Sequence, residues 1–249
     1  HETESTPPAV CLSLRIDLEA VHFECWRTHP EQLFALPPKD QPFLNPNPPH
    51  DVSLWFKDLD TTVRRQQLLR DVLDGLGLDV DSVTALRVLF EVNTDIDWRG
   101  LFGCFNAVEQ LVVGGAAVQP LVDELCANPF ESYPSSSLEV TFEKPAIPDP
   151  ADSQWLFPNL HRLKVGHTNF LSYPDKNKEY LCTVFIKMLE DARGCAVMDI
   201  RELLVEDCGV DESTIEEFRR VVPKVSWDGR FMFSAIMPGD DDLENVWAL

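Results

Sequence analysis

The sequence predicts an α/β fold in which short parallel strands alternate with helices along an irregular solenoid. A short apolar pattern recurs along the chain, and between its copies the apolar residues are spaced as on one side of a helix. Strands that alternate with helices form a parallel sheet with helical crossovers. Polar residues stand at every second position of the strand copies, so we expect one face of the sheet to meet water and the helices to cover the other.

The repeated pattern has three apolar residues, with two variable positions after the first and one after the second. Its clearest copies begin at Val83, Val108, Leu160 and Ile200, and weaker copies begin at Ala9, Asp51, Ser135 and Val222. The starts at 83, 108, 135 and 160 are 25, 27 and 25 residues apart, within the range of about 20 to 29 that is typical of leucine-rich repeats. Cys208 follows the Ile200 start by eight residues, where such a repeat has Asn or Cys. The pattern indicates an irregular leucine-rich-repeat solenoid, with parallel strands on one curved sheet and helices on its other face.

One-sided apolar stripes predict the helices between the strands. They cover residues 68–76, 118–126 and 181–192, and a shorter stripe covers 98–105. Ser213, with Glu216 three residues later, is typical of a capping box that starts another helix.

A doubly wound sheet would give the same alternation of strands and helices. Its strands are buried on both faces and read as continuous apolar runs, whereas Arg162 and Lys164 place charge at alternate positions of one strand copy. No Gly-x-Gly-x-x-Gly or phosphate loop follows any strand. These two observations favour the solenoid.

Residues 1–230 are expected to form one solenoid, interrupted by two proline-rich insertions. The first insertion, at 30–50, contains seven prolines, and the second lies near 145–158. Such proline density excludes helix and central strand, so we expect extended loops. Residues 231–249 read as an acidic tail, with Asp240, Asp241 and Asp242 in a row.

The charge and the cysteines limit the partners and the compartment. The formal net charge of −21 argues against nucleic-acid and anionic-membrane partners. No apolar run approaches the roughly 18 residues of a membrane span. The seven cysteines are odd in number and form no Cys-x-x-Cys pair, which favours a reducing compartment, cytoplasmic or nuclear.

No catalytic or metal-binding constellation stands out, so we expect neither an enzyme nor a cofactor. His22, Cys25 and His29 come closest to zinc-ligand spacing, but no second ligand pair lies nearby in the sequence. His161 and His167 flank one strand copy and are expected to be contact residues or bystanders rather than a general base. We therefore expect no metal site.

The variable positions of the strand copies define the expected binding surface. They project from the sheet face opposite the three apolar positions, and a mixture of both charge signs with apolar residues suits protein recognition. The expected contact residues are Arg87, Gln110, Val112, Glu139, Arg162, Lys164, Glu202 and Leu204. Charge reversal at Arg162 or Lys164 is then expected to weaken binding without unfolding the chain. The alternatives are that this face is merely solvated, or that the proline-rich insertions cover it.

Two segments carry a family resemblance. Residues 156–163 (LFPNLHRL), followed by a helix, and the ending formed by 211–215 (DESTI) and 221–229 (VVPKVSWDG) resemble repeats of F-box-like proteins of mushroom-forming fungi. The resemblance covers roughly residues 50–230 and implies irregular leucine-rich repeats that recognise the substrate of a ubiquitin ligase.

The same family carries a short helical F-box ahead of its repeats. No Leu-Pro-x-Glu helical segment precedes residue 9, and the chain starts at His1, so we expect it to be a fragment or to lack an N-terminal part. Docking onto the ligase adaptor is expected only if an F-box lies outside this chain. The alternatives are a stand-alone protein-interaction scaffold and, from another class, an α/β enzyme.

Overall fold

The computed structural model describes the parts of the chain that form the sheet and its helices. These are residues 11–16, 20–26, 52–57, 62–75, 79–91, 96–126, 156–172, 180–194 and 198–230. The expected contact residue Glu139, the first proline-rich insertion, most of the second and the tail at 231–249 lie outside them.

The described strands form one open sheet of eight strands in the order β3-β2-β1-β4-β5-β6-β7-β8. Their bounds are β1 Cys11–Ile16, β2 Ala20–Trp26, β3 Val52–Lys57, β4 Ala85–Phe90, β5 Gln110–Gly115, β6 Arg162–Gly166, β7 Glu202–Glu206 and β8 Lys224–Trp227. Strand β1 pairs in parallel with β4, and every later strand pairs in parallel with the next. Strand β2 is antiparallel to both β1 and β3. The α/β class and the mostly parallel sheet are therefore confirmed.

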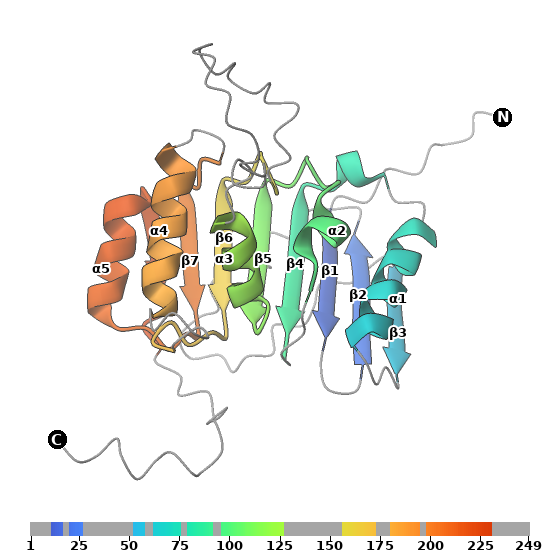
Figure 1. Cartoon of the computed structure of the whole chain (residues 1–249). Coiled ribbons are helices and arrows are strands. Elements are labelled where there is room, and N and C mark those ends of the chain that lie inside the picture. Colours follow the sequence, from blue (N-terminus) through green and yellow to red (C-terminus); the bar gives the residue numbers. More distant parts are fainter. Residues whose placement is uncertain are drawn as a thin grey trace, which may run out of the picture.

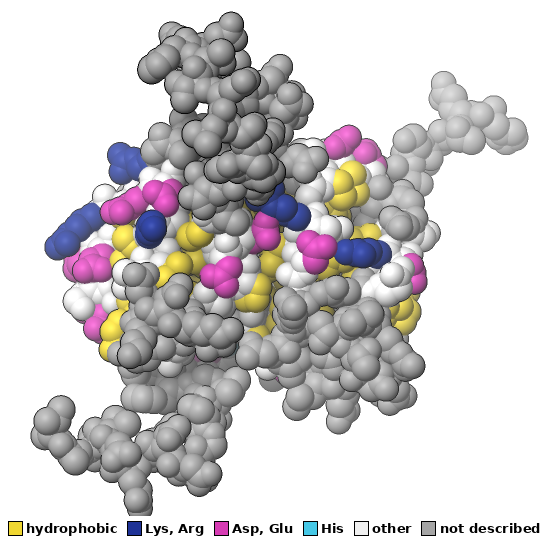
Figure 2. Space-filling view, viewed as in Figure 1, with side chains coloured by type: hydrophobic (Ala, Val, Ile, Leu, Met, Phe, Trp, Pro, Cys, Tyr) yellow, Lys and Arg dark blue, Asp and Glu magenta, His cyan; other side chains and the backbone are white. Residues whose placement is uncertain are grey.

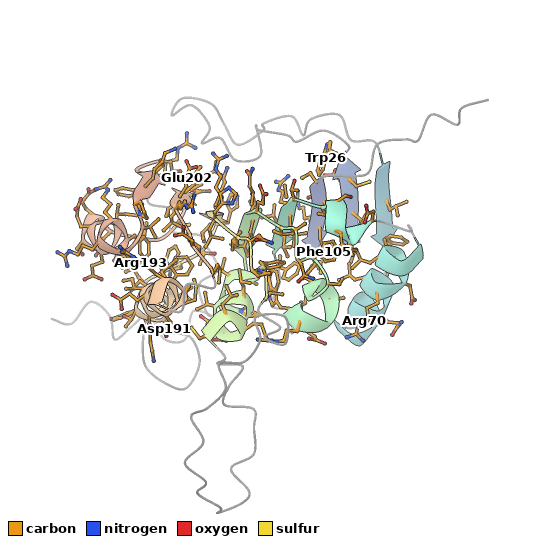
Figure 3. The ribbon with its side chains drawn as sticks, turned by 90° about the horizontal axis from the view of Figure 1, so that it is seen from above. Trp26, Arg70, Phe105, Asp191, Arg193 and Glu202 are labelled. Carbon is orange, nitrogen blue, oxygen red and sulfur yellow. The ribbon has the colours of Figure 1, made fainter. Side chains whose placement is uncertain are left out.

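The helices form a second layer on one face of this sheet. They are α1 Thr62–Gly75, the 3-10 turn η2 Val80–Ser82, α2 Trp98–Phe102, α3 Val118–Cys126, α4 Leu181–Gly194 and α5 Glu212–Val221. Figures 1 and 3 show α1 to α5 side by side on the same side of the strands. The sheet surface opposite to them is called the helix-free face below. No helix of the described residues is both long and apolar enough to cross a membrane.

Rows of apolar side chains hold the two layers together. Leu86 lies beside Leu111, Leu111 beside Leu163, and Leu163 beside Leu203. All four are buried in the core between sheet and helices. Each fully buried Leu contributes about 1.5–3 kcal/mol, so these rows fix the register of the parallel strands.

Aromatic rings close the core beneath the last helices. Phe170, in the turn after β6, contacts Phe185 of α4 and Phe218 of α5, with ring centroids 5.2 Å and 5.4 Å away. Phe185 and Phe218 are 5.5 Å apart and also meet edge to face. The apolar stripe predicted for α4 therefore packs against its neighbouring helix as well as the sheet.

The start of α5 differs from the expected capping box. Asp211 is the N-cap, and its Oδ1 accepts a hydrogen bond of 2.8 Å from the backbone N–H of Thr214. The hydroxyl of Ser213 donates to the same carboxylate at 2.9 Å. A carboxylate satisfies an amide at a helix start more strongly than a hydroxyl does, so Asp211 takes the position that we assigned to Ser213.

Two of the weaker pattern copies do not have the expected place in the sheet. The copy at Ser135 lies outside the described residues, and β5 pairs directly with β6. The copy at Asp51 corresponds to β3, which lies at the sheet edge beyond β2. The sequence pattern also misses β2, whose alternation of Val21, Phe23 and Cys25 faces the core. A pattern of three apolar residues predicts a strand, but it does not predict which strands pair with it in the sheet.

Four turns after successive strands share one backbone conformation. Gly115, His167, Asp207 and Gly229 have φ of 63°, 52°, 51° and 70°. The strand registers, continued beyond the paired residues, place all four at the same level of β5, β6, β7 and β8. We call these four residues the left-handed turn positions. Glycine adopts this conformation without steric cost, whereas His167 and Asp207 adopt it with a Cβ.

Candidate interface on the helix-free sheet face

The helix-free face carries three rows of side chains that cross the strands. Register assigns one row to the amino-terminal ends of the parallel strands: Trp26, Cys11, Ala85, Gln110, Arg162, Glu202 and Lys224. The middle row contains Glu24, Ser13, Arg87, Val112, Lys164, Leu204 and Ser226. The carboxyl-end row contains His22, Arg15, Leu89, Gly114, Gly166 and Glu206. Figure 3 shows Trp26 and Glu202 on the side away from the helices, and Phe105 between the layers.

Seven of the eight expected contact residues fall into two of these rows. Gln110, Arg162 and Glu202 are neighbours in the amino-terminal row. The middle row holds Arg87, Val112, Lys164 and Leu204 in register. The sequence pattern therefore identifies which residues share a face, and their role in binding stays a prediction.

Ion pairs link the amino-terminal row across β6, β7 and β8. Glu202 lies between two cations, with Oε2 3.0 Å from Nε of Arg162 and Oε1 2.6 Å from Nζ of Lys224. Arg162 also donates to Oε1 of Gln110 at 3.4 Å. Lys224 is 65% exposed at the outer end of this row, so the row runs from the sheet interior to solvent at the β8 edge.

The centre of the middle row is buried, contrary to the expectation of a wet face, whereas Glu24, Arg87 and Ser226 in the same row are half-buried. Val112, Leu204 and Lys164 are all buried. Burial also lowers the pKa of the Arg87 guanidinium, with Glu24 acting in the opposite direction. The described helices lie on the other face, so they do not account for this burial. Alternation of polar and apolar residues assigns a side of the strand but not the exposure of that side.

A small apolar cluster occupies the same face at the β1, β2 and β4 end. It consists of Cys11, Trp26, Ala85 and Val112, and it is separate from the main core. Burial raises the pKa of the Cys11 thiol to about 12, so this thiol is inert. The helix-free face thus carries this apolar cluster towards one end and an ion-paired half over β6 to β8.

The outer surface of the helix layer has a different character. Figure 2 views this layer from outside and shows acidic and basic side chains scattered over it. Arg99 of α2 pairs with Glu124 of α3, and Arg219 pairs with Glu216 within α5. Tyr180 is the large apolar side chain that is exposed among the described residues.

The zinc-like spacing of His22 and Cys25 does not form a site. Cys25 faces the main core, whereas His22 is an odd number of residues away on the same strand and faces the other side. No group of three or more metal-ligating side chains is present in the described part of the chain. His29 and the acidic triplet Asp240–Asp242 lie outside the described residues.

A contact between His167 and Asp207, at two of the left-handed turn positions, was not anticipated from the sequence. Nδ1 of His167 lies 3.1 Å from Oδ2 of Asp207. His161, the other histidine that flanks β6, has its Nδ1 3.4 Å from the carbonyl oxygen of Asn159. His167 and Asp207 are 40 positions apart in sequence. Extending the repeat register two residues beyond Val165 and Val205 would have brought them together.

Comparisons with protein-family models, with curated proteins and with solved structures find no match to this chain. The fold and the face define only a class: an open, mostly parallel α/β sheet with a helix layer on one side.

Proposed function

We propose that this chain is a protein-binding domain of the leucine-rich-repeat type, which binds its partner through the helix-free face and carries no catalytic centre. The observation that carries the proposal is the repetition from β5 to β8. Each of these strands has the same side-chain register and ends at a left-handed turn position. Repeat proteins stack such units and use the exposed sheet surface for recognition.

A ladder of side-chain hydrogen bonds supports the repeat assignment. The Asn or Cys position of a leucine-rich repeat follows the first apolar residue by eight. Here it is occupied by Thr168 and Cys208. The hydroxyl of Thr168 donates to the carbonyl oxygen of Gly115 at 3.2 Å, and Sγ of Cys208 donates to that of Val165 at 3.7 Å. Both bonds reach back to the preceding strand, as a stacking contact between repeats requires.

The ion-paired half of the face is the part that we assign to the partner. Arg162, Glu202 and Lys224 offer charge of both signs on rigid strands. Strands hold side chains with little freedom, so little entropy is lost when a partner binds. Glu202 pairs with both cations, so a partner that binds here competes with these ion pairs.

The test compares the face with the helix layer in affinity capture followed by quantitative mass spectrometry. Lys224→Glu changes the exposed end of the ion-paired row, and Arg193→Glu makes the same charge change on α4. We expect a specific partner to be depleted at least roughly tenfold, a free-energy loss of about 1.4 kcal/mol, by Lys224→Glu and to be retained by Arg193→Glu. Equal capture by both variants would reject the face as the binding surface.

The resemblance in segments 156–163 and 221–229 leads to a finer proposal: the partner is the substrate of an F-box-type ubiquitin ligase in the cytoplasm or nucleus. Co-expression of the full-length gene product with the ligase adaptor tests it. A stoichiometric complex supports this role. A full-length product that captures the same partner without the adaptor supports the stand-alone scaffold instead.

A further inference from the structure

The left-handed turn positions differ in the residues that occupy them. The outer two are Gly115 and Gly229, and the two between them are His167 and Asp207. A residue with a Cβ adopts this conformation at a cost that glycine does not have, and His and Asp are among the non-glycine residues that adopt it most often. These two strained residues lie on neighbouring strands, and their side chains contact each other. An observed backbone outlier of this kind is a reason to look for a role of the side chain.

The carboxylate of Asp207 has unusual surroundings. Its side chain is 0% exposed, whereas that of His167 is 49% exposed. Neither carboxylate oxygen of Asp207 accepts a hydrogen bond with acceptable geometry. The 3.1 Å contact from His167 Nδ1 is imperfectly aligned, and it lowers the pKa of Asp207 mainly through charge, with hydrogen bonding as a smaller contribution. A protonated imidazole gains a direct charge attraction to the carboxylate that a neutral one lacks.

The other groups around Asp207 are mostly acids. Its backbone N–H donates to Oδ2 of Asp228 at 2.9 Å, and Oδ1 of Asp228 accepts from the N–H of Arg230 at 3.0 Å. Glu206 precedes it in the chain and is held by Lys164, 2.6 Å away. Burial raises the pKa of Asp207, His167 opposes the shift, and Asp228 and Glu206 add to it. Asp228 and Glu206 thus both disfavour the ionised form of Asp207, and one additional proton relieves this repulsion.

We propose that His167 and Asp207 form a proton-uptake site that clamps the end of β6 to the end of β7 at mildly acidic pH and loosens as the pH rises. The pair binds one proton from solvent, and no other bond forms or breaks. The proton belongs to the pair, because two groups this close titrate together. The proposal is independent of the binding role assigned to the helix-free face, and its test needs no partner.

The sign follows from linkage. A carboxyl group with a raised pKa in the folded chain is penalised when ionised, so stability falls as the pH rises through that value. A proton on the His167 ring places a positive charge beside the Asp207 carboxylate, so the ion pair exists only while that proton is bound. The pair therefore makes the folded chain more stable on the acid side, relative to variants that lack it.

The test measures urea unfolding of the whole chain at about pH 5.5 and about pH 8, on either side of the ordinary histidine titration. His167→Gln removes the titrating ring, and His161→Gln is the matched control, since its ring contacts a backbone carbonyl rather than a buried carboxylate. We expect acidification to favour the wild-type chain over His167→Gln by roughly threefold to tenfold in the unfolding equilibrium constant. We expect His161→Gln to follow the wild type.

Glycine variants keep the test decisive if His167→Gln folds poorly. His167→Gly and Asp207→Gly place at these turns the residue that already stands at Gly115 and Gly229. We expect both to be at least as stable as the wild type at about pH 8, where strain is relieved, and less stable at about pH 5.5. Gly229→Ala, whose Cβ would meet nothing within 4 Å, reports the strain alone and should show no pH dependence of its effect. The same difference between wild type and His167 variants at both pH values would overturn the proposal.

Discussion

Nζ of Lys164 lies 2.6 Å from Oε2 of Glu206, with side-chain exposures of 8% and 13%. The pair joins β6 to β7 on the helix-free face, close to the buried side chains of Leu204 and Val112. In such surroundings each charge depends on the other, because removal of one leaves the second desolvated and unpaired.

The first prediction concerns this pair. Lys164→Met keeps the aliphatic stem and removes the charge, and we expect it to destabilise the chain by about 2–4 kcal/mol. The matched control is Lys224→Met, which breaks an ion pair to Glu202 at a position 65% exposed, with an expected effect of about 0–1 kcal/mol. Urea unfolding at neutral pH measures both. Equal losses would mean that the Lys164 pair is as well solvated as the Lys224 pair.

This prediction replaces an expectation drawn from the sequence. The sequence predicts that charge reversal at Lys164 leaves the fold intact. The registers confirm the faces, yet Lys164 is buried. Lys164→Glu is therefore unsuited to a binding test, and Lys224→Glu takes its place.

A second prediction tests the rows of the core. Leu163 is 0% exposed and lies between Leu111 and Leu203 in the row of leucines that faces the helices. We expect Leu163→Ala to destabilise the chain by about 2–5 kcal/mol, from lost transfer energy and the cavity left behind. Leu68→Ala, in the partly buried stripe of α1, is the control, with a smaller loss of about 1 kcal/mol. Thermal unfolding measures both losses. A larger loss of stability for Leu68→Ala than for Leu163→Ala would contradict the assigned core.

Much of this fold could be predicted because its strands repeat one pattern. Leu86, Leu111, Leu163 and Leu203 stand at the same position of four pattern copies, and these residues pair in the sheet. A parallel sheet with one buried face ties register to apolar residues, since a slip of one residue would expose them. The stripe at 118–126 likewise matches α3 residue for residue.

The rest depends on contacts that a local pattern does not contain. Strand β2 forms an antiparallel pair with β1, and β3 lies beyond β2 at the edge of the sheet. The sequence pattern does not indicate which edge of the sheet the next strand joins. Lys164 stands at a polar position of the alternation along β6 and is nevertheless buried. The contact of His167 with Asp207 depends on two turns with left-handed backbone conformation. In a sequence such turns are usually recognised by a glycine, and neither position has one here.

A third prediction concerns thiol reactivity. Burial raises the pKa of Cys208 and of Cys11 to about 12, so at about pH 8 on the order of one thiol in ten thousand is ionised. Cys104 is exposed. We expect iodoacetamide to modify Cys104 in the folded chain at least roughly a hundredfold faster than Cys208 or Cys11, as read by peptide mass spectrometry. Urea should abolish the difference; equal labelling of Cys208 without urea would show that this part of the repeat opens readily.

The last prediction concerns the start of α5 and its dependence on pH. The hydrogen bond from the backbone N–H of Thr214 lowers the pKa of Asp211, and the Ser213 hydroxyl adds to the effect. A lowered pKa means that the carboxylate stabilises the folded chain above its ordinary value near 3.9 and that this contribution is lost as the pH falls through the folded value. We expect Asp211→Ala to destabilise the chain by about 1 kcal/mol at neutral pH, as loss of a helix N-cap does. Below about pH 3 the difference should shrink towards zero, because the protonated carboxyl is a poor cap. Ser213→Ala is the control and should change stability by less at every pH, because its hydroxyl supports the cap without contacting the helix amides. If urea unfolding gave the larger loss for Ser213→Ala, the capping box predicted from the sequence would describe this helix better than the Asp211 cap does.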